Sequence, residues 1–436
     1  MQNPDSNIRR HALVVAYYFP PLGLSGVQRV SKLVKYLPEN GWDVTVLTVE
    51  PGAYFAFDDG LLAELNGEGI TIHRTKTLDP TTRSSGRKLV PFPEESKRRF
   101  LSWASQFFLI PDNKIGWKGP AVRAAKQLMK ERPFDLIYAT APPYTALMVG
   151  AEISRIERLP LVLDYRDDWL MNPRHSYPTK VHRSISASKE AEVLKEASVV
   201  LTINETIAGL VGERAPDIST VVVPQGFDPA DFSAKDLDEI DSRNTADQNR
   251  QMVFLYSGMF YDAQQPDVFL KALKNVLEDQ PELKQKVVAS FVGLLSDRVI
   301  KLVADLGLES VVRTNGYQDH SASVAELKKC DVAWMTVGRQ EGEEMISTGK
   351  LFEYIGSGKP ILALVPDGEA KTALLDYEAS FICPPDDQKK IEMEIGRLVK
   401  LWEDSALPEG RNDENSRYDR RHLARKVADI FNSLLD

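Results

Sequence analysis

The sequence predicts an α/β protein of two doubly wound domains, each a parallel sheet covered by helices. Its 436 residues exceed what one hydrophobic core usually organises, so two domains are expected. Apolar runs of strand length alternate with helix-length stretches along both halves, as in strands buried on both faces of a parallel sheet. A polar stretch with almost no large apolar residues separates the halves. We therefore expect domains at 1–235 and 252–414, a linker at 236–251 and a tail helix at 415–436.

The first half opens with the unit that starts a doubly wound sheet. Residues 12–19 are a continuous apolar run, a loop with Gly23 and Gly26 follows, and residues 27–37 have helical periodicity before a strand at 44–48. Gly26 would let the backbone approach a phosphate at the start of that helix. Such glycines are also common in turns without a ligand, so this signal is weak alone.

Two later strands of the first half are each followed by polar residues. Open α/β sheets bind ligands beyond the carboxyl ends of their strands. The strand at 134–140 leads to Tyr144, and the run at 161–169 contains four charged candidates, Asp164, Arg166, Asp167 and Asp168. We expect these residues to lie at a ligand-binding site. The alternative is that they are loop-capping carboxylates with one ion pair.

In the second half, strands are predicted at 253–258, 287–293, 311–317, 331–337 and 361–365. The central segment is 347–360, STGKLFEYIGSGKP. Ser347 and Thr348 are suited to cap a helix, and Gly358 followed by Pro360 ends it.

Lys350 and Glu353 would project from one face of the first turns of this helix, because they are three residues apart. A helix N-terminus offers N–H groups to an anion, and Lys350 adds a full charge. Glu353 is a bidentate acceptor suited to two sugar hydroxyls. A phosphate bound at the N-terminus of this helix and a ribose diol bound one turn further along it would together form a nucleotide-sugar site. The alternative is an ordinary surface Lys/Glu pair.

The composition limits the partners and the compartment. The chain has 54 basic and 63 acidic residues, a net charge of −9, which argues against nucleic acid. Its two cysteines, Cys330 and Cys383, lack metal-ligand spacing and are expected to be buried thiols in a reducing compartment. Neither a signal peptide nor a membrane-spanning segment is visible, so a cytoplasmic protein is expected.

Residues 81–120 differ from the rest of the acidic chain in being basic and rich in aromatic residues. Such a segment can lie in a membrane interface, which would place the protein at the inner face of the plasma membrane. The alternative is a core helix whose basic residues face solvent.

The segment KLFEYIGSGKPI resembles the Lys-x-x-Glu-Tyr-x-x-x-Gly-Lys-Pro segment of the retaining glycosyltransferases of family 4. The glycine loop near Gly26, the run at 161–169, similar to that of members acting on lipid-linked sugars, and PQGFD at 224–228 extend the resemblance over most of the chain. It implies the GT-B fold, two Rossmann-like domains facing a central cleft, with a last helix that returns to the N-terminal domain. It also implies that Glu353 holds the donor ribose, that stereochemistry is retained and that no metal is obligatory.

The sequence departs from the family pattern at positions that matter for phosphate and sugar binding. Met259 and Gln264 stand where basic residues are common, and Met345 stands where a second Glu is usual. The loop before Tyr144 lacks the His that many relatives carry. A donor phosphate oxygen that takes the acceptor's proton would make such a base unnecessary.

These observations define the candidate residues. The catalytic candidates are Lys350, Glu353, Arg339 and Asp167. The donor-binding candidates are Gly26, Gly258, Ser347, Thr348, Gly349, Lys350 and Glu353. The acceptor-side candidates are Asp164, Arg166, Asp168 and Tyr144.

The predicted function is sugar transfer from a nucleoside diphosphate sugar to a glycan, a lipid-linked sugar or a small-molecule acceptor. The donor is a co-substrate, and no cofactor or metal is expected. One alternative is a GT-B nucleotide-sugar epimerase, which would act without an acceptor. Another is a catalytically degenerate, transferase-like binding subunit. A dehydrogenase is disfavoured, since neither half has the full Gly-x-Gly-x-x-Gly fingerprint with its acidic residue.

Overall fold

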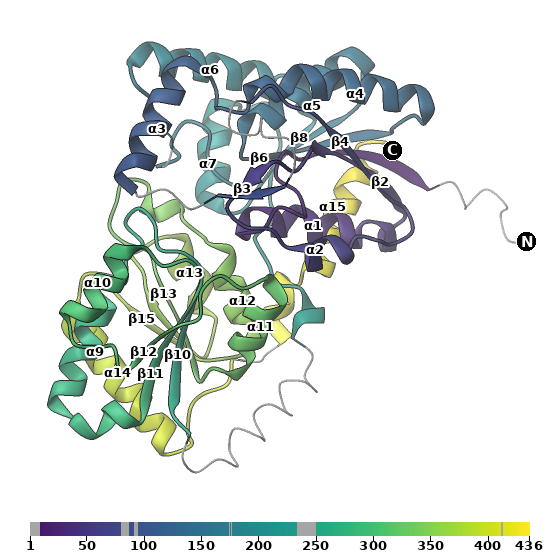
Figure 1. Cartoon of the computed structure of the whole chain (residues 1–436). Coiled ribbons are helices and arrows are strands. Elements are labelled where there is room, and N and C mark those ends of the chain that lie inside the picture. Colours follow the sequence, from purple (N-terminus) through teal and green to yellow (C-terminus); the bar gives the residue numbers. More distant parts are fainter. Residues whose placement is uncertain are drawn as a thin grey trace, which may run out of the picture. The chain divides into compact units, whose positions relative to one another are not determined.

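The computed structural model describes residues 9–79, 87–90, 95–173, 175, 177–232, 250–410 and 413–436. The chain divides into two compact units, Met1–Pro224 with Arg420–Asp436, and Gln225–Asp419 (Figure 1). Most of the linker predicted at 236–251 lies outside the described residues, as do parts of the basic segment at 81–120. Among the helices described, none is both long and apolar enough to cross a bilayer.

The first unit contains a parallel sheet whose seven described strands have the order β4-β2-β1-β6-β7-β8-β9. These strands are β1 Arg10–Val15, β2 Trp42–Val49, β4 Ile70–Thr75, β6 Leu136–Ala141, β7 Leu161–Tyr165, β8 Val199–Thr202 and β9 Thr220–Val222, and a separate pair is β3 Ala53–Tyr54 with β5 Lys88–Leu89. Strands are added outward from β1 in one direction and from β6 in the other. The connection order therefore reverses between β1 and β6, where open sheets bind ligands.

Helices cover both faces of this sheet. The described helices of this unit are α1 Gln28–Tyr36, α2 Asp59–Ala63, α3 Glu95–Phe108, α4 Lys118–Glu131, α5 Tyr144–Glu157, α6 Lys180–Leu194, α7 Glu205–Arg214 and α15 Arg420–Ser433. Figure 1 shows α1 and α15 on one side of the sheet and α4 and α5 on the other. Because both faces are covered, Ala12 to Val15 of β1 are all fully buried, which explains the continuous apolar run.

The tail helix α15 is part of the first unit. Its Phe431 is fully buried and packs edge-to-face against Trp42 at a ring-centroid distance of 5.2 Å. The side-chain oxygen Oδ1 of Asn432 accepts hydrogen bonds from Trp42 Nε1 at 3.2 Å and from Arg10 Nη1 at 3.0 Å. The last residues of the chain therefore close the core next to β1 and β2.

We expect Phe431→Ala to destabilise the first unit by about 3–5 kcal/mol, because it removes a buried aromatic ring and leaves a cavity. Asp429→Ala, on the exposed side of the same helix, should change stability by less than about 0.5 kcal/mol. Thermal unfolding of both variants is the measurement. Equal melting temperatures for the two would show that α15 does not support this core.

The second unit contains a parallel sheet whose six described strands have the order β12-β11-β10-β13-β14-β15. The strands are β10 Met252–Ser257, β11 Val287–Val292, β12 Val312–Thr314, β13 Val332–Thr336, β14 Ile361–Leu364 and β15 Ser380–Cys383. The helices are α9 Asp267–Asp279, α10 Asp297–Asp305, α11 His320–Lys329, α12 Gly349–Ser357, α13 Glu369–Leu375 and α14 Gln388–Glu403. Here the order reverses between β10 and β13.

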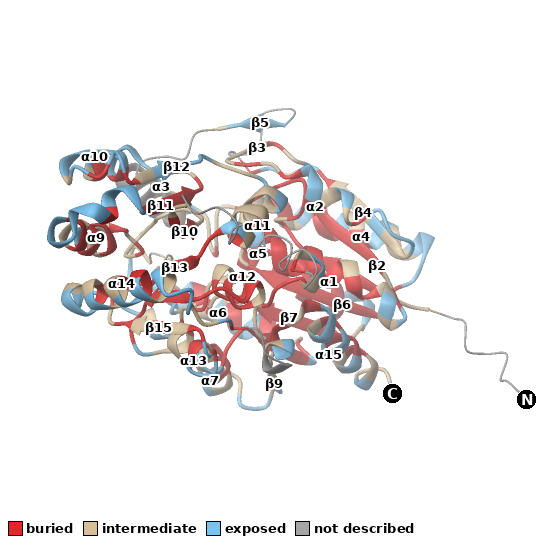
Figure 2. Cartoon of the chain, turned by 90° about the horizontal axis from the view of Figure 1, so that it is seen from below, coloured by how far each residue is buried: buried red, intermediate tan, exposed pale blue. Residues whose placement is uncertain are grey.

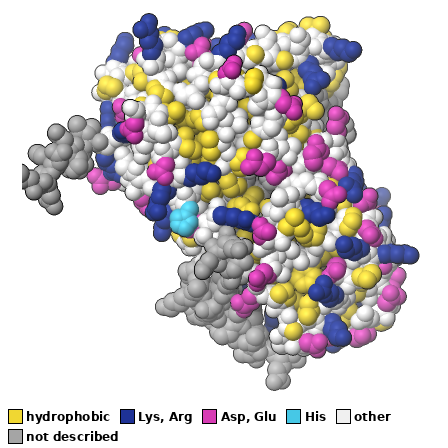
Figure 3. All heavy atoms as spheres, turned by 180° about the vertical axis from the view of Figure 1, so that it is seen from behind, with side chains coloured by type: hydrophobic (Ala, Val, Ile, Leu, Met, Phe, Trp, Pro, Cys, Tyr) yellow, Lys and Arg dark blue, Asp and Glu magenta, His cyan; other side chains and the backbone are white. Residues whose placement is uncertain are grey.

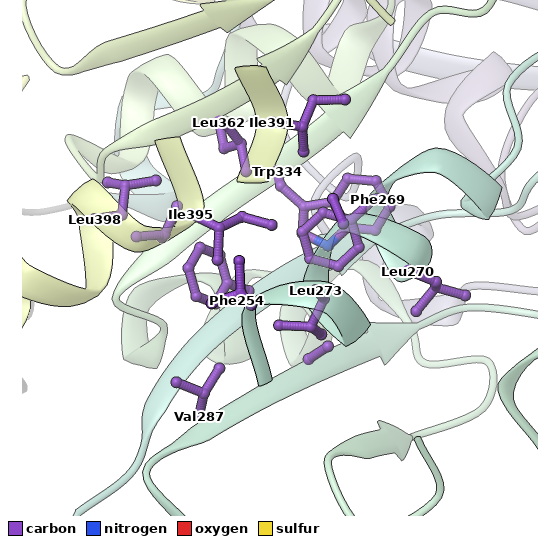
Figure 4. Packing of buried hydrophobic residues seen from close by; sticks show 14 of the residues in the cluster. Phe254, Phe269, Leu270, Leu273, Val287, Trp334, Leu362, Ile391, Ile395 and Leu398 are labelled. Carbon is purple, nitrogen blue, oxygen red and sulfur yellow. The ribbon is translucent and has the colours of Figure 1, made fainter. Parts of the chain in front are cut away.

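Alternate residues of the central strands enter two different cores. Trp334 of β13 packs with helices α9 and α14, stacked on Phe269 at a centroid distance of 3.9 Å (Figure 4). The neighbours of Trp334, Ala333 and Met335, belong to the core formed with α11, α12 and α13. Figure 2 shows the result, with buried strands inside and exposed residues on the outer sides of the helices.

The second unit has a short edge strand and two buried cysteines. The strand predicted at 311–317 is shorter, since β12 is an edge strand with three residues in register with β11, and Gly316 then turns the chain with φ +65°. The thiols of Cys330 and Cys383 are buried and are not joined in a disulfide.

Candidate functional site

The candidate site of the second unit lies at the carboxyl end of β10, where the strand order reverses. Gly258 follows β10 with φ +130°, and Gly293 follows β11 with φ +139°, both unfavourable for residues with a Cβ. A Cβ at Gly293 would also overlap the carbonyl of Gly258. The glycines therefore let the loop after β10 lie directly against the end of β11.

Lys350 reaches this edge from α12. Its Nζ donates a 2.6 Å hydrogen bond to the hydroxyl of Tyr256 and lies 3.8 Å from the centroid of that ring. A Cβ at Gly258 would be 3.0 Å from the same Nζ, so glycine leaves room for the ammonium group. Burial raises the pKa of Tyr256 well above its ordinary value, which keeps the hydroxyl protonated. The structure thus brings Lys350 and Gly258 together.

The helix that carries Lys350 begins and ends where the sequence analysis placed it. Gly358 is the C-cap with φ +71°, and Thr348 occupies the N-cap position. The Thr348 side chain makes no capping hydrogen bond, however, and its hydroxyl oxygen is buried without a partner among the described residues. The backbone of Thr348 is extended, as is usual for an N-cap residue.

Glu353 lies one turn further along α12 and contacts a residue that the sequence analysis missed. Its Oε1 is 3.2 Å from Nε2 of His320, the first residue of α11. Side-chain exposure is 21% for Glu353 and 10% for His320. No local sequence signal could have found this pair, because its members are 33 residues apart and on different helices.

Arg339 interacts with acidic residues outside the cluster formed by Lys350, Tyr256 and Gly258. Its Nη1 donates to Glu343 Oε1 at 2.8 Å, and its Nη2 is 3.6 Å from Asp386. The hydrogen bond to Glu343 raises the pKa of Arg339, which is about half exposed. Met345, in the position of the family's second Glu, is buried. Ser347 and Gly349 flank Thr348 at the start of α12.

In the first unit, Asp164 takes part in a buried ion pair. It lies on β7 and pairs with Arg29 of α1, Nη2 to Oδ1, at 2.8 Å, and Thr140 Oγ1 donates to Oδ2 at 2.7 Å. Burial opposes the charge of Asp164, but Arg29 outweighs it and lowers the pKa of the carboxyl group. Arg166, just after β7, donates to the backbone carbonyls of Ala141, Pro142 and Gly26. Both residues therefore hold loops together.

Asp168 and Tyr144 have similar structural contacts. Asp168 Oδ1 accepts from the backbone N–H groups of Leu170 and Met171, and its Oδ2 pairs with Arg214. The Tyr144 hydroxyl donates to the carbonyl of Asp168 at 2.7 Å.

Asp167 differs from these neighbours. It is half-buried, and within the described ranges no hydrogen bond or ion pair engages its carboxylate. Asp167 is thus the carboxylate of this run that is left available for a ligand. Gly26 lies in the short helix Ser25–Val27 of the same unit and is exposed.

Comparison with known proteins identifies the chain. A family model described as "Glycosyl transferase 4-like domain" matches residues 26–226, and one described as "Glycosyl transferases group 1" matches residues 238–410. The chain is a family 4-like glycosyltransferase. This confirms the resemblance that the sequence showed. No curated protein sequence matches this glycosyltransferase significantly.

Solved structures confirm the two-domain, Rossmann-like GT-B fold of the glycosyltransferase. Anabaena HepE in complex with UDP and glucose has a TM-score of 0.62 at 18% identity and covers 98% of this chain and 100% of its own. WaaG, a glycosyltransferase involved in lipopolysaccharide biosynthesis, has a TM-score of 0.58 at 15% identity, covering 97% and 99%. A putative UDP-N-acetylglucosamine 2-epimerase from Listeria monocytogenes has a TM-score of 0.57 at 11% identity, covering 98% and 96%.

The first unit of the glycosyltransferase also contains a buried acidic pair. Glu190 of α6 and Asp168 share Arg214, whose Nε is 3.0 Å from Glu190 Oε2. Burial, aided by the charge of Asp168, raises the pKa of Glu190 to about 7 in spite of Arg214. Folded protein therefore holds this proton more tightly than unfolded protein does.

Glu190 should make stability fall as pH rises. Its contribution is complete below the unfolded pKa of 4.5 and is lost as pH passes about 7. We expect the free energy of unfolding of the wild type, relative to Glu190→Gln, to drop by on the order of 2–3 kcal/mol between pH 4 and pH 8. Denaturant unfolding of both proteins at the two pH values is the measurement. Parallel pH dependence would contradict the raised pKa.

Proposed function

We propose that this glycosyltransferase takes its sugar from a nucleoside diphosphate sugar bound at the carboxyl edge of the second unit's sheet, and transfers it with retention. The observation that carries the proposal is the position of Lys350 and Glu353 on the first turns of α12. Lys350 reaches Gly258 at the end of β10, beside the point where the strand order reverses. Ligands of open α/β sheets bind at such points.

Lys350 is proposed to stabilise the diphosphate as it leaves. Its Nζ donates to the hydroxyl of Tyr256 at 2.6 Å and lies beside Gly258 at the end of β10. The start of α12, with Ser347, Thr348 and Gly349, adds backbone N–H groups and the positive end of a helix dipole. Charge developing on the leaving group is thereby met by groups already in place. Arg339 and the loop at Gly26 are further proposed donor contacts.

Glu353 is proposed to accept hydrogen bonds from the two ribose hydroxyls. Its Oε1 accepts from His320 at 3.2 Å, and a carboxylate has two oxygens that together can accept several hydrogen bonds. Support for a uracil-containing donor comes from HepE, which was solved with UDP. Neither a cofactor nor a metal is part of this proposal, and the donor is a co-substrate.

The acceptor is proposed to be a glycan, a lipid-linked sugar or a small hydroxyl compound near Asp167. Asp164, Arg166, Asp168 and Tyr144 are engaged in holding the surrounding loops, so their proposed role is to frame the acceptor. In the retaining mechanism a donor phosphate oxygen takes the acceptor's proton. A side-chain base is then unnecessary.

A calorimetric panel tests the donor. UDP, GDP and ADP, each alone and as a glucose conjugate, are titrated into the protein. The compounds that contain one of the three bases should bind, and the melting temperature of the protein should rise with the concentration of these ligands. Absence of binding by all six compounds would contradict the donor assignment and favour the binding-subunit alternative, which Met259 and Met345 support. Release of free nucleotide and an altered sugar without acceptor would favour the epimerase alternative, which the Listeria neighbour supports.

We also propose that the first unit contacts an anionic membrane through an α3–α6 patch. Exposed apolar residues gather there, Leu101, Trp103, Phe107 and Phe108 on α3 and Val181 and Ile185 on α6. His182 Nε2 is 3.1 Å from the carbonyl oxygen of Phe107, so the two helices meet. Exposed Lys180 and Arg183 add positive charge. Figure 3 shows hydrophobic side chains at the surface among Lys and Arg on one face.

The patch predicts salt-sensitive binding to vesicles with phosphatidylserine. Phe108 is 81% exposed, and Phe108→Ser should reduce co-sedimentation several-fold, because each basic or apolar contact contributes about 1 kcal/mol. Met393→Ser is the matched control, since Met393 is 73% exposed on α14 of the second unit. Absence of co-sedimentation of the wild type at low salt would contradict membrane contact.

A further inference from the structure

His320 lies between two carboxylates of the second unit. It opens α11, and its Nε2 is 3.2 Å from Oε1 of Glu353 and 3.9 Å from Oδ2 of Asp231. Asp231 ends the short helix Pro229–Asp231. The three side chains are only 10–21% exposed, so their interactions are weakly screened by solvent.

The chemistry of the three groups fixes the direction of the contact. Ionised carboxylates only accept hydrogen bonds, so Nε2 of His320 must carry the proton that faces Glu353. The side chain of Asp319, next to His320, is directed to the start of its own helix, where Oδ1 accepts from the backbone N–H of Ala322 at 2.8 Å. The carboxylates of Asp231 and Glu353 both face Nε2 of the ring.

The segment that carries Asp231 also contacts α12 at a second place. Phe227 packs so closely on Gly356 that a Cβ there would overlap the ring. The backbone N–H of Phe227 donates to the carbonyl of Tyr418 at 3.0 Å, which fixes the segment from the other side. Residues 227–231 thus hold α12 through Phe227 and lie next to Glu353 through His320.

We infer that His320 is a positioning residue for donor binding, and that it acts by holding the Glu353 carboxylate. The inference rests on the proposed function, because Glu353 is the proposed ribose ligand. With Oε1 held by His320, Glu353 keeps one orientation before the donor arrives. Less conformational freedom is then lost on binding, so affinity increases. Asp231 lies 3.9 Å from the same Nε2 and so connects the imidazole to segment 227–231.

Calorimetric titration of the donor found in the panel tests this inference. His320→Leu should weaken binding by roughly three- to ten-fold, as expected for one lost hydrogen bond. His320→Gln keeps an N–H donor and should stay within about two-fold of the wild type. If His320 served only folding, its substitutions would lower the melting temperature, but the donor affinities of His320→Leu and His320→Gln would not differ in this way.

The second arm repeats the change in a Glu353→Gln background. In that background His320→Leu should lower donor affinity by less than about two-fold, because the effects of two substitutions that disrupt the same contact are not additive. An equal loss in both backgrounds, or wild-type affinity for His320→Leu, would overturn the inference. If His320→Leu does not fold, Asp231→Ala provides the same comparison, with an expected loss of about two-fold that disappears with Glu353→Gln. A wild type that binds no donor would instead contradict the proposed function.

Discussion

Glu353→Gln is expected to weaken binding of the nucleoside diphosphate sugar by about ten-fold or more while leaving the fold intact. Hydrogen bonds to a carboxylate contribute about 1.5–3 kcal/mol each, and ten-fold corresponds to about 1.4 kcal/mol. The amide keeps the size of the side chain but loses the charge, and one of its acceptors becomes a donor. The substitution also removes the charge-assisted contact between residue 353 and His320, so the contacts of this side chain with both the ribose and His320 weaken.

Titration of the donor into the wild type and Glu353→Gln measures this effect. Glu326→Gln is the matched control, since Glu326 lies on α11 and pairs with Lys329 at 3.2 Å on the surface. Glu326→Gln should bind the donor as the wild type does, because the Glu326–Lys329 pair is not part of the proposed donor site. Its loss should also change stability little, since exposed ion pairs contribute about 0–1 kcal/mol. Equal affinities of the wild type and Glu353→Gln would contradict the nucleotide site.

The strands and the helix of the candidate site could be predicted because their signals are local. The run 361–365 is apolar throughout, and the structure forms β14 from Ile361 to Leu364, buried on both faces. Helix α12 could be placed because Gly358 and Pro360 end it, and Gly358 has the positive φ that glycine favours. Local propensity and tertiary packing agree in this segment.

What the sequence could not show is which polar groups pair over long distances. The strand-end rule pointed to Asp164, which lies within β7 near its carboxyl end, but its partner Arg29 is 135 residues away on α1. Periodicity describes α1 as a helix without showing that one of its basic residues is buried against a carboxylate. The same holds for His320 and Glu353, since their contact depends on the packing of α11 against α12.

The buried pairs change how the acceptor-side candidates are interpreted. A carboxylate that is already satisfied, as Asp164 is by Arg29 and Thr140, cannot accept from a ligand without breaking those bonds. Asp167 carries no such cost, because among the described residues no hydrogen bond or ion pair engages its carboxylate. Acceptor contact is therefore best sought at Asp167, whereas substitution of Asp164 should act first on stability.

Lys350→Ala is expected to lower turnover far more than it lowers affinity for the nucleoside. The Nζ group lies at Gly258 and donates to the hydroxyl of Tyr256, so its positive charge is held at the carboxyl end of β10. A charge that meets the departing diphosphate stabilises the transition state more than the bound donor, so its loss appears in kcat. Removing one such group typically costs about 10²–10³-fold.

Steady-state kinetics with the donor and its acceptor separate the two effects. kcat should fall by about 10²-fold or more, whereas the Kd of the nucleoside monophosphate should change by less than about three-fold, since it lacks the leaving diphosphate. Lys371→Ala removes an equal charge from an exposed pair with Asp367 and should leave both quantities unchanged. A loss of nucleoside affinity that accounts for the whole loss of kcat/KM would mean that Lys350 only binds the donor. The loop at the start of α12 would then have to stabilise the leaving group through its backbone N–H groups alone.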